Sequence, residues 1–130
     1  MRTIKFRGKD AENGMWIYGD LFQRIGFYPQ IIEYFADDNG KLAYRGIAVQ
    51  ENTVGQFTGL HDKDGKEIYE DDIVEFVDIN LPDCVIVYDN GSFMYRELGE
   101  DISTEELRIQ FTVEVIGNIH DNPELLKNND

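Results

Sequence analysis

The sequence predicts a mainly β protein, a barrel or sandwich of short strands with little helix. Short segments that alternate apolar and polar residues follow one another along the chain, and helical periodicity is almost absent. Turn pairs such as Asn13-Gly14 and Asp64-Gly65 separate these segments, as expected for tight hairpins. Of the 130 residues, 42% are hydrophobic and 12% aromatic, enough for a packed interior. We therefore expect one folded domain.

The first part of the chain reads as a series of strands. Residues 3–7 alternate, with Ile4 and Phe6 on one face and Lys5 and Arg7 on the other, which predicts a half-buried strand with a basic outer face. Further strands are expected over residues 15–22, 28–35 and 42–49, with turns at 13–14 and 37–41.

The second part continues the pattern. Strands are expected over residues 54–60 and 71–78, and residues 83–98 form the clearest hairpin, with its turn at residues 89–91. Residues 101–110 read as a helical turn capped by Ser103, because Glu106 stands at the spacing of a capping box. Residues 111–119 predict a last strand, and Asn122 followed by Pro123 predicts a short closing helix.

The net charge of −14 is unevenly distributed. Residues 1–50 carry seven Lys or Arg and six Asp or Glu, whereas residues 51–130 carry five and twenty. A strongly anionic surface repels phosphate backbones, so we expect no direct nucleic-acid binding, and a basic protein partner would be attracted to it. We divide the single domain, residues 1–130, into an N-terminal β subregion at 1–54 and an acidic subregion at 55–130.

Residue usage also indicates the compartment. The only cysteine is Cys84, so no disulfide can form within the chain. No apolar run approaches the length of a membrane span, and the first residues lack the apolar core of a signal peptide. We expect a soluble protein of the cytoplasm, with no membrane partner.

The segment "DKDG" suggests a calcium loop, but its spacing argues against one. With Gly65 at the sixth position of such a loop, Asp62 and Asp64 fall on ligand positions, but Leu60 occupies the first and Asp71 the last. The two histidines, His61 and His120, lack further cysteine ligands for zinc. We therefore expect no metal and no cofactor, and interpret the segment as a hairpin turn.

The residues also give no sign of catalysis. Cys84 opens an apolar strand, where cysteines usually act as inert hydrophobes, and Ser92 and Ser103 lie in turn or cap contexts. The segment "GQFTG" lacks the lysine and helix of a phosphate-binding loop. The aromatic residues, interpreted as core or subunit contacts rather than a base-stacking surface, include Trp16, Tyr18, Phe27, Tyr28, Tyr34, Phe35 and Tyr44. We expect a protein that is not an enzyme.

Three segments stand out: "IKFRGKDAENGMWIYGDL", "VGQFTGLHDKDGKEIYEDDIVEF" and "VEVIGNIHDNPELL". In their order and spacing, which match across nearly the whole chain, they resemble the YopX family of phage and prophage proteins from Gram-positive bacteria. The chain departs from the family pattern at Asp71, where the family commonly has glycine. The resemblance implies a β-rich fold with an SH3-like barrel after residue 55. It implies no activity, because the family is one of uncharacterised function.

The leading hypothesis is a non-enzymatic phage or prophage accessory protein that works by binding a phage or host protein. Two alternatives stay open. In one, the basic N-terminal strand docks on the acidic barrel of the next subunit and builds a homo-oligomer; in the other, the acidic part mimics DNA and inhibits a nucleic-acid-binding protein. We also expect the chain to form a homo-oligomer. The candidate protein-binding residues are Arg2, Lys5, Arg7, Gln56, Thr58 and His61.

Overall fold

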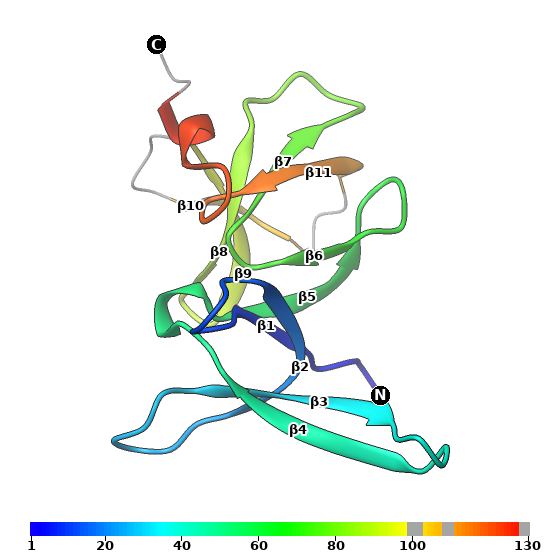
Figure 1. Ribbon diagram of the computed structural model, residues 1–130. Coiled ribbons are helices and arrows are strands. Elements are labelled where there is room, and N and C mark those ends of the chain that lie inside the picture. Colours follow the sequence, from blue (N-terminus) through cyan, green and yellow to red (C-terminus); the bar gives the residue numbers. More distant parts are fainter. Residues whose placement is uncertain (99–102, 108–110, 128–130) are drawn as a thin grey trace. The chain divides into compact units, whose positions relative to one another are not determined.

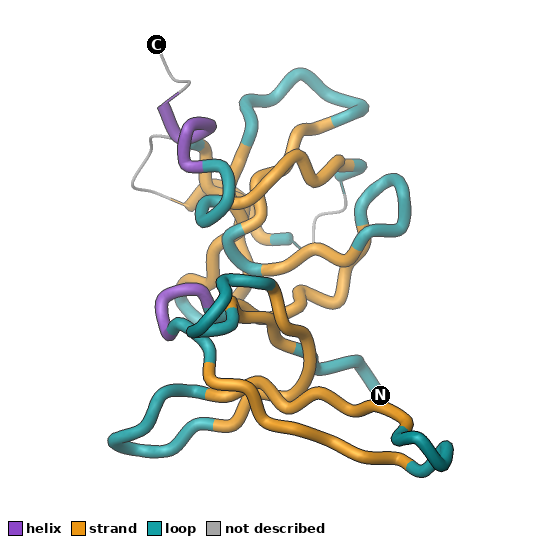
Figure 2. The backbone as a smooth tube through the Cα atoms, in the orientation of Figure 1, coloured by secondary structure: helices purple, strands orange, loops and turns teal. Residues whose placement is uncertain are grey.

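The computed structural model describes residues 1–98, 103–107 and 111–127, and within them the protein is mainly β, as predicted. The strand pairs whose register is defined are antiparallel, and the helices within the described residues are two short 3-10 segments (Figure 2). The chain divides into two compact units, Met1–Phe57 and Thr58–Asp130. Each is described separately below.

Unit 1 contains five strands in the order β4-β3-β2-β1-β5 (Figure 1). Their bounds are β1 Phe6–Lys9, β2 Trp16–Phe22, β3 Gln30–Ala36, β4 Leu42–Ala48 and β5 Gly55–His61, with the 3-10 helix η1 at Glu51–Thr53. The turns predicted at residues 13–14 and 37–41 are present. In them, Gly14 and Gly40 have the positive φ that such turns need. Strand β5 continues past Phe57, where unit 2 begins.

The core of unit 1 lies on one face of this sheet. Ile31 and Val49 are fully buried. Gly8 lies against Val49, and a Cβ built on Gly8 would meet the Val49 side chain at 2.9 Å. Asp10 and Val49 form an isolated bridge that ties the chain after β4 to the end of β1. The interior of unit 1 is therefore small, and it needs glycine at residue 8.

Unit 2 contains the rest of β5 and six further strands. Strand β6, Glu67–Tyr69, neighbours β5, and the other five form a sheet in the order β10-β9-β8-β7-β11. Their bounds are β7 Asp72–Phe76, β8 Cys84–Asp89, β9 Ser92–Glu97, β10 Ser103–Glu106 and β11 Val113–Asn118, and the 3-10 helix η2 follows at Pro123–Lys127. The predicted hairpin is β8–β9, with Asn90 and Gly91 both at positive φ.

The interior of unit 2 contains two hydrophobic clusters. The larger one includes Val74, Phe76, Ile86 and Tyr95, and the Phe76 and Tyr95 rings lie 5.2 Å apart. The smaller cluster is built on Ile73 and Val85. The adjacent residues Ile73 and Val74 enter different clusters, so β7 is buried on both faces at this point, whereas Glu75 is exposed.

One local expectation needs correction. The helical turn predicted around Ser103 is wrong, because Ser103–Glu106 is strand β10 and pairs with β9; residues 101, 102 and 108–110 of that segment lie outside the described residues. A capping-box spacing cannot nucleate a helix where a neighbouring strand offers its edge. Asp71, where the family commonly has glycine, has φ of 72°, the conformation that favours glycine.

Candidate functional site

Asp62 lies in the central segment "DKDG", for which the sequence suggests a metal site or a hairpin turn. Its carboxylate makes hydrogen bonds within the fold. Asp62 is buried, and its Oδ1 accepts hydrogen bonds from the backbone N–H groups of Asp64 and Lys66, both at 2.9 Å. Its Oδ2 accepts a third, from Val115 at 3.0 Å. The carboxylate therefore closes the β5–β6 turn and fastens it to β11.

The electrostatics of Asp62 agree with this structural role. Burial of the carboxyl disfavours its charged form, but the backbone donors from Val115, Lys66 and Asp64 outweigh burial and lower the pKa of Asp62 below its usual value. Beside it, Lys63 Nζ pairs with Glu114 at 3.1 Å, which raises the pKa of Lys63. The negative charge on Asp62 is thus stabilised by the fold itself.

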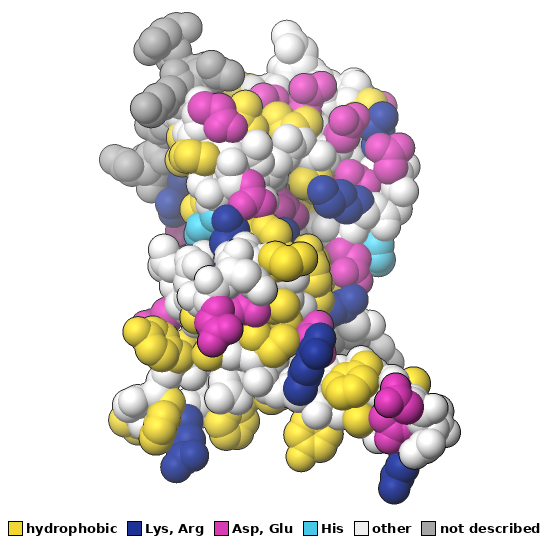
Figure 3. Space-filling view, in the orientation of Figure 1, with side chains coloured by type: hydrophobic (Ala, Val, Ile, Leu, Met, Phe, Trp, Pro, Cys, Tyr) yellow, Lys and Arg dark blue, Asp and Glu magenta, His cyan; other side chains and the backbone are white. Residues whose placement is uncertain are grey.

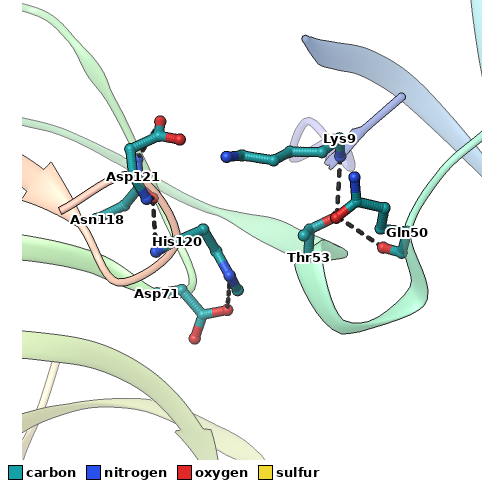
Figure 4. A network of polar contacts seen from close by, with 7 residues as sticks. All are labelled: Lys9, Gln50, Thr53, Asp71, Asn118, His120 and Asp121. Atoms are coloured by element: carbon teal, nitrogen blue, oxygen red, sulfur yellow. Dashed lines mark hydrogen bonds and ion pairs between the residues drawn. The ribbon is translucent and has the colours of Figure 1, made fainter. Parts of the chain in front are cut away.

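A second polar network joins the segment that follows β11 to the β6–β7 turn (Figure 4). His120 Nε2 lies 2.9 Å from Asp71 Oδ2, and Ile119 donates its backbone N–H to Asp71 O. Asn118 Oδ1 accepts from the backbone N–H groups of His120 and Asp121. The aspartate at the glycine-like position therefore ties the two family segments together. Within the residues that the structure describes, no group of three or more His, Cys, Asp or Glu side chains is arranged to hold a metal ion.

Two of the six candidate protein-binding residues have contacts within their own unit. Arg7 is only 5% exposed, and its guanidinium lies 4.5 Å from the centre of the Trp16 ring. The Thr58 hydroxyl donates to Ile68 O and accepts from Leu60 N, so it supports the hairpin.

The other four candidates differ in exposure. Lys5 and Gln56 are half-buried, with the Lys5 ammonium 5.8 Å from the centre of the Phe57 ring. Arg2 and His61 are exposed. The prediction that these residues bind a partner stays a prediction, but the burial of Arg7 removes the central cation from the proposed basic strand face.

Cys84 lies in the larger core cluster of unit 2 and is 4% exposed. Burial, with the nearby acids Glu97 and Asp83, raises the pKa of its thiol to about 11. We expect the native protein to react with iodoacetamide at pH 8 at least about a hundredfold more slowly than the urea-unfolded chain, because the thiolate is both scarce and covered. Mass spectrometry of timed samples measures both rates, and similar rates would show that the thiol is accessible.

The structure reveals a surface that the sequence did not predict. Partner residues of neighbouring strands share a face, and alternate residues of one strand lie on opposite faces. The face of β2–β3–β4 opposite Ile31 therefore contains one set of side chains, which we call the aromatic face: Tyr18, Asp20, Phe22, Gln30, Ile32, Tyr34, Leu42 and Tyr44.

The aromatic face is exposed. Tyr44 is 70% exposed, Tyr34 56% and Phe22 48%, and hydrophobic side chains reach the surface along β3 and β4 (Figure 3). The expectation that these rings are core residues is therefore wrong for the aromatic face. The other alternative, a contact with another chain, remains.

The aromatic face also has defined internal geometry. Tyr34 and Tyr44 are partners across β3 and β4, with ring centres 6.2 Å apart. The Tyr34 hydroxyl donates to Asp20 Oδ2 at 2.9 Å, which raises the pKa of Tyr34. A groove of about 380 Å³ is lined by Phe22, Gln30, Ile32, Tyr34 and Tyr44. This face offers apolar rings with a single carboxylate among them.

Comparisons with known proteins agree with the fold. A family model described as YopX protein matches residues 5–127. Among solved structures, protein EF1440 from Enterococcus faecalis is similar, with 26% sequence identity and a TM-score of 0.57 over 97% of this chain and 99% of that chain. No curated protein matches significantly. None of the described helices is long and apolar enough to cross a membrane.

Proposed function

This chain belongs to the YopX family, and we propose that it is a non-enzymatic accessory protein of a phage or prophage that binds another protein through the aromatic face of unit 1. The observation that carries the proposal is the exposure of this face. The outer face of a solvated antiparallel sheet is normally polar, whereas here it presents Phe22, Tyr34 and Tyr44. Exposed apolar patches of this kind mark interaction sites.

Residue type supports the same conclusion. Aromatic residues, tyrosine above all, dominate the energetically important centres of protein interfaces. The family motif residues in unit 2, by contrast, have structural contacts: Asp62 binds three backbone N–H groups, and Asp71 binds His120. The motif thus stabilises the fold of unit 2, whereas unit 1 makes the contact with the partner protein. We propose that the protein acts in the bacterial cytoplasm.

The charge distribution suggests different roles for the two units, attraction of the partner by unit 2 and contact with it by unit 1. Unit 1 carries seven Lys or Arg and seven Asp or Glu and is neutral, whereas unit 2 carries five and nineteen. The acidic unit 2 would speed the approach of a basic partner, and the neutral aromatic face would hold it. Among the earlier alternatives, docking of the basic strand is weakened by the burial of Arg7.

The test compares two tyrosines of nearly equal exposure, Tyr34 at 56% on the aromatic face and Tyr88 at 54% in unit 2. A partner is recovered by affinity capture from the bacterial host, purified, and titrated against each variant. We expect Tyr34→Ser to raise the dissociation constant at least about tenfold, as for an interface hot spot, and Tyr88→Ser to leave it within about twofold. Equal effects of the two variants, or none from Tyr34→Ser, would refute the aromatic face as the contact surface.

A further inference from the structure

Strand β4 forms an open edge of the sheet in unit 1. It is the last strand in the order, and no described strand pairs with its outer side. Natural edge strands are usually kept from pairing by prolines, bulges, inward charges or short length. Strand β4 has seven residues and no proline, and its register with β3 continues without a shift from Leu42 to Ala48. The edge is long and regular enough to accept another strand.

Backbone contacts on either side of β4 show which of its groups point outward. Lys41 O accepts from Asp37 N, and Val49 N donates to Pro29 O, so both residues face the β3 side. Successive residues of a strand direct their N–H and C=O groups to opposite sides. The outward residues are therefore Leu42, Tyr44, Gly46 and Ala48, and Ala48 O already accepts from Ala11 N.

We propose that β4 pairs antiparallel with β4 of a second copy of this chain, around a two-fold axis at Tyr44. This register places Leu42 opposite Gly46 of the partner subunit and Tyr44 opposite Tyr44 of the partner subunit. All three outward residues then exchange hydrogen bonds, about six in total. Moving the axis to Gly46 would oppose Tyr44 to Ala48, whose oxygen is already used by Ala11.

The side chains agree with this register. Leu42, 75% exposed, comes to lie beside a glycine, so no Cβ stands directly opposite it. Arg45, which pairs with Glu33 at 3.0 Å, stands opposite Ala43 of the partner subunit, so the two arginines do not face each other. Tyr34 and Tyr44 of both subunits form one row across the joined sheets.

Charge favours a second copy at this edge. Two chains of net charge −14 repel each other wherever their acidic parts meet. The β4 edge belongs to unit 1, whose charges balance, so pairing there brings no excess of like charge into contact. The interaction is isologous, as in most homodimers, because one strand supplies both sides.

The dimer goes beyond the proposed function, because it uses the backbone edge of β4 and needs no foreign partner. It would join two aromatic faces into one surface. Binding to another protein can fail while the dimer stands, and the reverse also holds. The two proposals are therefore tested separately.

The first test is the mass of the purified full chain by light scattering over a range of concentrations. We expect a dimer, and we expect Leu42→Pro to raise its dissociation constant about tenfold or more, because proline removes one outward N–H from each subunit and its ring obstructs the partner. Leu42→Ala is the matched control, which loses the side chain but keeps the N–H. A wild-type monomer at all concentrations, or equal effects of the two variants, overturns the proposal.

The second test fixes the register by oxidative cross-linking, and it stands even if Leu42→Pro does not fold. Cys84 is buried and the only native cysteine, so the background is low. Tyr44→Cys should form an intersubunit disulfide, because directly opposed Cα atoms lie about 5.5 Å apart. Ala43→Cys should not, because the two residues 43 are diagonal neighbours about 7–8 Å apart. Equal cross-linking of both variants, or none with Tyr44→Cys, contradicts the pairing.

Discussion

Replacing Asp62 with alanine is expected to lower the free energy of unfolding by about 3–5 kcal/mol. The substitution removes the acceptor for three backbone N–H groups, those of Asp64, Lys66 and Val115. Hydrogen bonds to a charged group contribute about 1.5–3 kcal/mol each, and water can replace part of the loss. Urea denaturation followed by circular dichroism measures the change.

Asp64→Ala is the matched control, because Asp64 is an exposed acid in the same turn. It should change stability by less than about 1 kcal/mol. Asp62→Asn should fall between the two, since its amide retains one oxygen for the turn but turns a donor toward another N–H group. Equal stability of Asp62→Ala and Asp64→Ala would show that the carboxylate does not fasten the turn to β11.

The same contact gives stability a defined pH dependence. Because the fold lowers the pKa of Asp62, its ionised form stabilises the native state, and this contribution is fully present above the ordinary pKa of an aspartate, about 3.9. It is lost as the pH falls through the lowered native value. Asp62→Asn should therefore lose less stability on acidification than the wild type over that range.

Gly19→Ala is expected to destabilise unit 1 by about 2–4 kcal/mol. A Cβ at residue 19 would lie 2.0 Å from the backbone oxygen of Ile32, a distance that no rotamer change can relieve. Strands β2 and β3 would have to separate where Ile31 is buried. Thermal or urea unfolding monitored by the fluorescence of Trp16, in unit 1, measures the effect.

The control for this change is Gly14→Ala. Gly14 also needs a special backbone conformation, with φ of 73°, but nothing lies within 4 Å of its hypothetical Cβ. The Gly14→Ala variant should therefore lose only about 1 kcal/mol of stability, through backbone strain. A Gly19→Ala protein as stable as Gly14→Ala would mean that the close approach of β2 and β3 is readily relaxed.

Local chemistry made much of the fold predictable. Asp64-Gly65 and Asn90-Gly91 specify their turns through residues that accept positive φ, and both turns are present with glycine at φ of 83°. The alternation of Val85 and Val87 with Ile86 likewise predicted β8. The SH3-like character of the second part stays a prediction from the family resemblance.

Tertiary structure decided what the sequence did not predict. Ser103 and Glu106 lie in a strand because β9 offers an edge for pairing, and no local signal encodes that edge. Tyr34 and Tyr44 were expected inside or at a subunit contact, but a strand's alternation does not reveal which of its faces meets the core. Arg7 was expected outside, and stacking on Trp16 accounts for its burial.

Residue-resolved hydrogen exchange by NMR at low and high protein concentration directly tests both the Asp62 contacts and the pairing of β4 with a second copy. The amides of Asp64, Lys66 and Val115 bond to Asp62 within one chain, so their exchange should be slow and independent of concentration. The amides of Leu42, Tyr44 and Gly46 should exchange quickly when dilute and become protected as the concentration rises. Fast exchange of these three β4 amides at every concentration, or protection that increases only in unit 2, would contradict the pairing of β4.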